Sequence, residues 1–195
     1  MFKKTVLLGA AVAVLAAVVA PAAATAEITK QFWHNGQALQ QHVSVTLHGN
    51  FNFTSSAGGM SCDKTMTLTL TPGSSTADVT AFAPSSTASC TYSGNMDNLC
   101  GTVDAHQATG LPWTVHGTKY GSLYKLSITN LHTDTGGTGV FCPDVTVKGK
   151  VTLIFVENPV TRLIVHGTVA SNLGTELTVG GELDMTPGLT YGLEP

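Results

Sequence analysis

Seven histidines are the first candidates for chemistry in this sequence, because imidazole is a common metal ligand. His42, His48, His116 and His166 fall on the polar side of segments in which apolar and polar residues alternate. His42 and His48 lie about 20 Å apart along one strand face, so they cannot hold one ion together. His116 and His166 occur in a repeated Val-His-Gly-Thr tetrapeptide and could pair across neighbouring strands. We interpret all four as solvated surface imidazoles and predict no metal site and no cofactor.

Hydrolytic chemistry requires a nucleophile, a base and a group that orients the base. The sequence has many serines but no Gly-x-Ser-x-Gly motif, and its acidic residues occur singly rather than as the carboxylate pair of a glycosidase. Asp and Gly do not combine into a calcium-binding loop. The run Gly136-Gly137-Thr138-Gly139 lacks the strand-to-helix context of a phosphate-binding loop. We therefore predict no catalytic residues and a protein that is not an enzyme.

The elements that would have to position any site are strands. Apolar and polar residues alternate with period two, and turn-rich segments such as 71–75, 83–86 and 135–139 separate the alternating runs. No stretch has a sustained helical period. The clearest predicted strands are 43–53, 64–71, 145–155 and 176–185, and weaker ones are expected near 28–34, 77–83, 88–93, 113–118, 122–130 and 161–170.

One apolar face and one polar face on eight to ten strands predict an all-β, antiparallel fold, either a β-sandwich or a closed β-barrel-like sandwich. A membrane β-barrel shares this alternation but needs aromatic girdles and a lipid-facing apolar band, and the few, uneven aromatics of this chain disfavour it. Phe51, Phe53, Trp113 and Phe155 are expected either to fill the core or to line a cavity for an apolar ligand.

Residues 1–26 are predicted to be a signal peptide. Lys3 and Lys4 precede an uncharged apolar run, Pro21 ends that run, and Ala24-Thr25-Ala26 has the small-x-small pattern of a cleavage site. An uncleaved membrane anchor is the alternative, which the short, Ala-rich run disfavours. We expect residues 27–195 to form a single secreted β domain, extracellular or on the cell surface, or periplasmic if it is retained in a Gram-negative envelope, with no transmembrane segment after cleavage.

Four cysteines, Cys62, Cys90, Cys100 and Cys142, remain in the mature chain. Close Cys-x-x-Cys pairs, which zinc sites use, do not occur in the sequence. An even number of cysteines in an exported chain favours two disulfides, and four cysteines allow three connectivities. We favour Cys90–Cys100, which closes a local loop, together with Cys62–Cys142, which ties distant strands.

The composition limits the partners. Without Lys3 and Lys4 the chain has seven basic and twelve acidic residues, so its net charge is near −5. This balance disfavours nucleic acid and anionic lipid as partners. Threonine and glycine are abundant while charged residues make up 11% of the chain, a composition that suits an extracellular β protein.

Gly110-Leu111-Pro112-Trp113-Thr114-Val115 is the most distinctive segment. Proline cannot donate to a β-ladder, so Pro112 should begin a strand or lie on an edge, with Trp113 entering the core. This Leu-Pro-Trp follows Asn98-Leu99-Cys100-Gly101 by about ten residues. The pattern resembles the PraB family, small exported proteins labelled "protein activator of alkane oxidation". An upstream Cys62, a later Cys142 and a Gly-punctuated tail extend the resemblance.

The resemblance implies a secreted protein without known catalytic residues, associated with hydrocarbon use and with biofilm or surface material. The chain departs from the family pattern in its long, Ser/Thr-rich stretch between Phe53 and Cys100, and no functional residue carries over. Our first hypothesis is a non-enzymatic matrix, biofilm or adhesin-like component that self-associates or binds other surface proteins through strand edges. The alternative is an extracellular binder of apolar small molecules, such as alkanes, in a sandwich or barrel cavity.

Overall fold

The structure, a computed structural model, describes residues 31–34, 37–85, 90–120, 123–140, 142, 144–156 and 160–192. The predicted signal peptide lies outside the described residues, and its cleavage stays a prediction. The described chain forms strands and one short helix. In chain order these are β1 (Gln31–His34), β2 (Gln37–Ala38), β3 (Val43–Ser55), β4 (Gly58–Leu70), β5 (Thr76–Pro84), β6 (Cys90–Gly94), α1 (Asn95–Cys100), β7 (Val103–Ala108), β8 (Trp113–Tyr120), β9 (Leu123–Gly137), β10 (Val145–Phe155), β11 (Val160–Ser171) and β12 (Glu176–Gly192).

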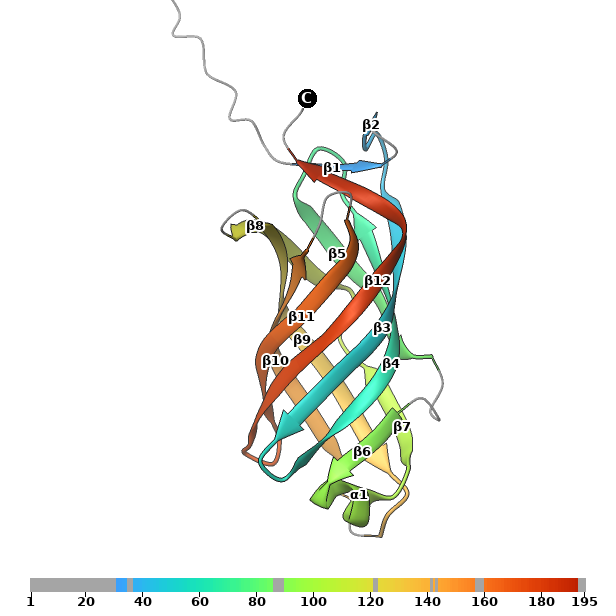
Figure 1. Ribbon diagram of the computed structural model, residues 1–195, viewed down its shortest axis with the longest axis vertical. Helices are drawn as coiled ribbons and strands as arrows, with labels where there is room; N and C mark the ends of the chain where they lie inside the picture. Colours follow the sequence, from blue (N-terminus) through green and yellow to red (C-terminus); the bar gives the residue numbers. More distant parts are fainter. Residues whose placement is uncertain are drawn as a thin grey trace, which may run out of the picture.

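Eight of the strands close into an antiparallel barrel (Figure 1). Their hydrogen-bonded order is β11-β10-β9-β8-β5-β4-β3-β12, and the pairing of β11 with β12 completes the ring. The short strands attach to this ring: β1 pairs with β12 and β2 with β1, while β6 pairs with β4 and β7 with β9. The predicted all-β antiparallel fold is confirmed, in its closed-barrel form. Side chains can just fill the interior of a barrel with eight strands.

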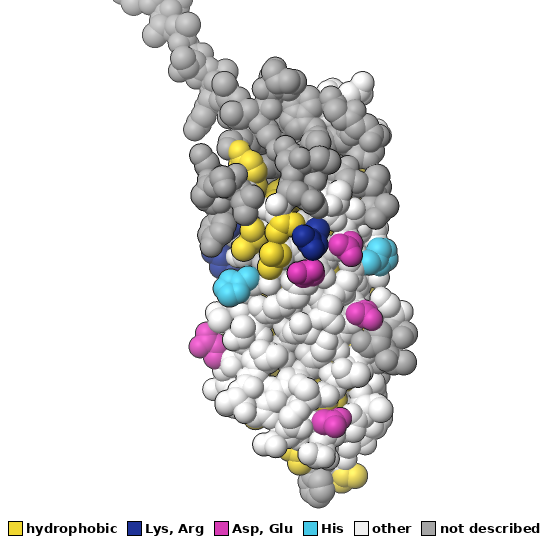
Figure 2. Space-filling model, in the orientation of Figure 1, with side chains coloured by type: hydrophobic (Ala, Val, Ile, Leu, Met, Phe, Trp, Pro, Cys, Tyr) yellow, Lys and Arg dark blue, Asp and Glu magenta, His cyan; other side chains and the backbone are white. Residues whose placement is uncertain are grey.

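The alternation of the sequence decides which side chains fill the barrel. On β3 the odd positions Leu47, Phe51 and Phe53 are buried, and on β4 the even positions Met66 and Leu68 are buried. The other long strands also alternate, but in β9 a register shift between Ile128 and Leu131 moves the inward row from even to odd positions. The outward positions carry mainly hydroxyls, amides and a few charges, and Figure 2 shows that charged groups are sparse on the face it presents.

The four aromatic residues expected in the core or at a cavity are all buried. Phe51 and Trp113 are fully buried, and Phe53 and Phe155 are each 3% exposed. Phe82 of β5 joins them, with ring centroids 5.0 Å from Phe51 and 5.6 Å from Trp113. Trp113 begins β8 directly after Pro112, as predicted, and its indole N–H donates to the Thr109 carbonyl oxygen at 2.9 Å. Phe51, Phe82 and Trp113 therefore form a continuous aromatic row inside the barrel.

The barrel wall is built differently at its two ends. Towards the upper end in Figure 1, β5 and β8 pair with each other and connect β4 to β9. Towards the lower end, β6 replaces β5 beside the first residues of β4, and β7 replaces β8 beside the last residues of β9. In the part of the chain that the structure describes, no ladder joins β6 to β7. The lower wall therefore has a seam between them, which the Tyr92 hydroxyl crosses by donating to the Gly136 carbonyl oxygen at 3.2 Å.

Two disulfides fix the segments beside this seam, Cys62–Cys90 and Cys100–Cys142. The prediction of two disulfides is confirmed, but the predicted pairing is wrong. Cys90 lies directly opposite Cys62 in the β4–β6 ladder, and α1 carries Cys100 to the segment that follows β9. The crosslinked residues are 28 and 42 positions apart, for which restriction of the unfolded chain contributes about 3–4 kcal/mol per disulfide.

Among the described residues, no helix has the length and apolar character needed to cross a membrane.

Candidate functional site

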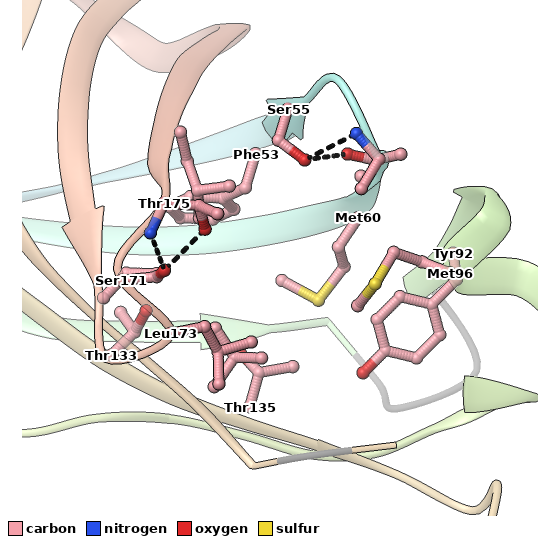
Figure 3. A pocket seen from close by; sticks show the side chains of 16 residues that line it. Phe53, Ser55, Met60, Tyr92, Met96, Thr133, Thr135, Ser171, Leu173 and Thr175 are labelled. Carbon is pink, nitrogen blue, oxygen red and sulfur yellow. Dashed lines mark hydrogen bonds between the residues drawn. The ribbon is translucent and has the colours of Figure 1, made fainter. Parts of the chain in front are cut away.

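A cavity of about 140 Å³ lies at the lower end of the barrel. The turns of the β3–β4 and β11–β12 hairpins, the β6–α1 segment, and strands β9 and β10 surround it. Figure 3 shows the side chains of Met60, Met96 and Tyr92 gathered on one side, with Leu173 and Thr135 facing them. A dry apolar cavity of roughly 150 Å³ is large enough to bind benzene. This cavity is therefore of the right size for a small apolar molecule.

Hydrogen bonds within the two hairpin turns hold the rim of the cavity in place (Figure 3). The Ser55 hydroxyl donates to the Gly58 carbonyl oxygen at 3.0 Å and accepts from the Ala57 N–H at 3.2 Å. The Ser171 hydroxyl accepts from the Thr175 N–H at 3.2 Å and lies 2.7 Å from the Thr175 hydroxyl. Leu173, at the tip of the second turn, lines the cavity while half exposed. The rim is thus preformed by hydrogen bonds, and Leu173 contributes an apolar side chain to it.

Lys64 is the most unusual residue of the interior. It lies on β4 in the same inward row as Met66 and Leu68, and its side chain is fully buried. Its Nζ has no hydrogen-bond partner and lies 5.2 Å from the centroid of the Phe82 ring, a cation–π distance. Loss of hydration lowers the pKa of Lys64 from 10.5 to about 7. Burying an amine without a hydrogen-bond partner lowers the free energy of unfolding. A residue that is kept at this cost is a candidate functional group.

His106 of β7 lies in the same interior. Its Nδ1 is 2.8 Å from the Thr135 hydroxyl, and its ring centroid is 6.1 Å from that of Phe82 and 6.2 Å from that of Phe53. The Nε2 atom is buried without a partner. Loss of hydration, and secondly repulsion from Lys64, lower the pKa of His106 to about 3. The imidazole is therefore neutral at neutral pH.

Thr133 connects this polar pair to the cavity. Its hydroxyl is buried without a hydrogen-bond partner, and its side chain lines the cavity together with Thr135 and Phe53. Thr135 in turn holds His106, and Phe53 contacts the His106 ring. We define Lys64, His106, Thr133 and Thr135 as the polar cluster. Thr133 and Thr135 line the cavity, His106 lies behind Thr135, and Lys64 and His106 both lie against Phe82.

The lowered pKa of His106 predicts that the protein becomes less stable in acid. Because the unfolded imidazole titrates near 6.5 and the folded one near 3, the unfolded chain binds more protons between these pH values, and stability falls as the pH falls. We expect the free energy of unfolding to drop by about 2.5 kcal/mol from pH 7 to pH 4.5 through this group alone. Urea unfolding at pH 7 and pH 4.5 should show this drop for the wild type and not for His106→Asn. His116→Asn, which removes an exposed imidazole, should retain the wild-type slope; equal slopes in all three proteins would contradict the assignment.

The structure separates the histidines that the sequence analysis considered. His116 on β8 and His166 on β11 have β9 and β10 between them, about 14 Å at the usual strand spacing, so they do not pair across neighbouring strands, which was the alternative to surface imidazoles. His48 is exposed, with its Nδ1 3.0 Å from the Thr65 hydroxyl, and His42 is exposed just before β3. Among the described residues, no group of three or more His, Cys, Asp or Glu side chains could hold a metal ion.

Sequence analysis missed the polar cluster. One signal for Lys64 was present, since it occupies an even position of β4 in register with Cys62 and Met66, which are buried. His106 and Thr133 gave no such signal, because register shifts in β7 and β9 interrupt the alternation ahead of them. Of the four predicted aromatics, Phe53 is the one that lines the cavity.

Comparison of the chain with protein-family models, with curated proteins and with solved structures finds no match. The resemblance to the PraB family therefore stays a prediction that rests on the Cys-to-Leu-Pro-Trp segment.

Proposed function

We propose that the protein binds small apolar molecules in the cavity at the lower end of the barrel. The observation that carries this proposal is the apolar cavity of about 140 Å³, whose rim is preformed by hydrogen bonds. Met60 and Met96 suit this role, because flexible thioether side chains adapt to ligands of different shapes. The two disulfides agree with action in an oxidising compartment outside the cytoplasm. Hydrocarbons, which the PraB resemblance implies, belong to the same chemical class.

The methionine methyl groups allow a direct test of binding. Met60 and Met96 line the cavity, whereas Met66 and Met185 are buried in the core away from it. In spectra of protein labelled with ¹³C at the methionine methyls, we expect toluene to shift the Met60 and Met96 signals saturably. The Met66 and Met185 signals should stay in place, which makes them internal controls.

A cavity-filling variant tests the location of the bound molecule. Val147 lines the cavity, and Val147→Phe should abolish the toluene-induced shifts because the added ring occupies the same space. Ile164→Phe adds similar bulk on the outer face of β11 and should leave binding unchanged. Shifts that rise linearly to the solubility limit of toluene, or that affect all four methionines equally, would contradict the proposal.

A matrix, biofilm or adhesin-like role is our second proposal, supported by the outer surface. Hydroxyl-bearing side chains form contacts along this surface, such as Ser44 to Thr69 at 3.1 Å, and charge is sparse (Figure 2). Each of the eight strands of the closed barrel is paired along both edges. Among the described strands, β2, β6 and β7 each pair on one side, so their other edges could pair with a strand of another molecule. Sedimentation at high protein concentration, combined with cell fractionation, tests this role. A strictly monomeric protein that is absent from the surface and matrix would contradict it.

A further inference from the structure

We propose that the cavity takes an amphiphile with a carboxylate head group, which Lys64, His106 and Thr133 bind while the apolar chain occupies the cavity. This inference rests on the proposed function, because it assigns the ligand class of the same cavity. The apolar lining alone would accept any small hydrocarbon. The polar cluster behind the cavity favours a ligand that also carries hydrogen-bond acceptors for the unpartnered atoms of the cluster.

The first argument is the set of unpartnered polar atoms. Lys64 Nζ, His106 Nε2 and Thr133 Oγ1 are the three buried side-chain atoms of the described residues that lack a hydrogen-bond partner. Buried polar groups in proteins are nearly always hydrogen-bonded, and each exception needs an explanation. Lys64 Nζ and the His106 ring both lie against the Phe82 ring, and Thr133 lines the cavity beside Thr135, which holds His106. Their common location indicates that one missing group would satisfy them together.

The second argument is the chemistry of these atoms. An ammonium group has hydrogens to donate and no acceptor. When the Thr135 hydroxyl donates to His106 Nδ1, Nε2 carries the imidazole hydrogen and is a donor as well. The Thr133 hydroxyl, which is buried beside the cavity, can donate as well. A group with two acceptor oxygens therefore matches the three donors.

The third argument is the sign of the charge. The buried polar residues among the described side chains are Lys64, His106, Ser127, Thr133 and Thr135, and none of these is a carboxylate that could compensate Lys64. Among the described side chains, the buried titratable ones besides Lys64 are His106 on β7 and Tyr92 on β6, and loss of hydration keeps the His106 imidazole neutral by lowering its pKa. Water could satisfy the donors but could not neutralise the ammonium. An anion can do both. Pairing the buried ammonium with an anion is favourable, because an uncompensated charge in a buried site is strongly destabilising.

The size of the cavity limits the apolar chain. A volume of about 140 Å³ suits a short chain, such as that of hexanoate or octanoate, and excludes a long-chain fatty acid in full. The head group would pass Thr133 to reach His106, which Thr135 holds directly behind the cavity wall. The chain would then lie between Met60 and Met96, towards the opening.

Octanoate and octanol provide a matched pair of probes, since they share the chain and differ in the head group. We expect titrations followed by the Met60 and Met96 methyl signals to show octanoate binding at least tenfold more tightly than octanol at pH 7. Lys64→Met should abolish this difference by weakening octanoate binding at least tenfold. Lys150→Met removes an exposed lysine of β10 and should bind both probes as the wild type does.

The pH dependence adds a second readout. Because the ammonium form of Lys64 binds the anion, octanoate affinity should fall by about tenfold per pH unit above pH 7, while octanol affinity stays constant. Equal affinities of the wild type for the two probes, or unchanged octanoate affinity in Lys64→Met, would overturn the carboxylate assignment and leave the cavity proposal standing. If toluene, octanol and octanoate all fail to shift the Met60 and Met96 signals, the proposed function is overturned as well.

Discussion

Lys64→Met is expected to raise the free energy of unfolding at pH 7 by about 3 kcal/mol, although it changes a residue of the candidate site. Lys64 places an amine without a hydrogen-bond partner in an apolar interior, against the ring of Phe82. Methionine has a similar length and no polar group to dehydrate, so it removes this cost without leaving a cavity. Urea unfolding of the two oxidised proteins at pH 7 measures the difference.

The same variant should change the pH dependence of stability. The unfolded lysine titrates near 10.5 and the folded one near 7, so between these values the unfolded chain binds more protons and stability rises with pH. We expect the wild type to gain about 2 kcal/mol from pH 7 to pH 9 through this group, and Lys64→Met to gain none of it. Lys150→Met is the matched control and should keep the wild-type rise. A wild type whose stability does not rise over this range would show that Lys64 is hydrated or paired.

The expected gain in stability of Lys64→Met also tests whether Lys64 serves ligand binding. A stabilising substitution that abolishes octanoate binding would show that the chain retains a costly group for its ligand rather than for its fold. Thr133→Val offers an independent check, because valine keeps the shape of threonine and removes only the unpartnered hydroxyl. This variant should be at least as stable as the wild type and bind octanoate less tightly.

Much of the fold could be predicted because alternation is a local property. The rows that include Leu47 and Phe51 on β3, and Met66 and Leu68 on β4, point inward as their sequence pattern indicates. Trp113 also begins its strand where Pro112 predicts. Closure of the sheet into a barrel could not be decided in the same way, because it depends on which strands pair and not on which face each strand buries.

Sequence reasoning failed where pairing and register matter. The run 135–139 predicts a turn, but β9 continues to Gly137 because β7 pairs with its last residues. The disulfide pairing depended on β6 lying opposite the start of β4, a long-range contact with no local signal. The polar cluster depended on register shifts that turn His106 and Thr133 inward. The candidate site is therefore encoded in the irregularities of the strands rather than in their regular pattern.

Gly181→Ala is expected to destabilise the barrel by at least about 4 kcal/mol, or to prevent folding altogether. Gly181 of β12 has φ +146°, a backbone conformation that residues with a Cβ rarely adopt, and an added Cβ would lie 2.0 Å from the Asn50 carbonyl oxygen of β3. Gly49 of β3 has the reciprocal relation, since its Cβ would lie 2.1 Å from the Glu182 carbonyl oxygen of β12. The backbones of these two strands approach too closely for a side chain on either.

Gly180 provides a neighbouring control for this prediction. An added Cβ at Gly180 would meet nothing within 4 Å, so Gly180→Ala should change the free energy of unfolding by less than about 1 kcal/mol. Thermal unfolding of the two oxidised variants measures the contrast, and the yield of folded protein on expression reports on Gly181→Ala if it does not fold. Equal stability of the two variants would contradict the close approach of β3 and β12. A small barrel must bend its strands sharply to close, and at Gly181 and Gly49 that closure leaves no room for a side chain.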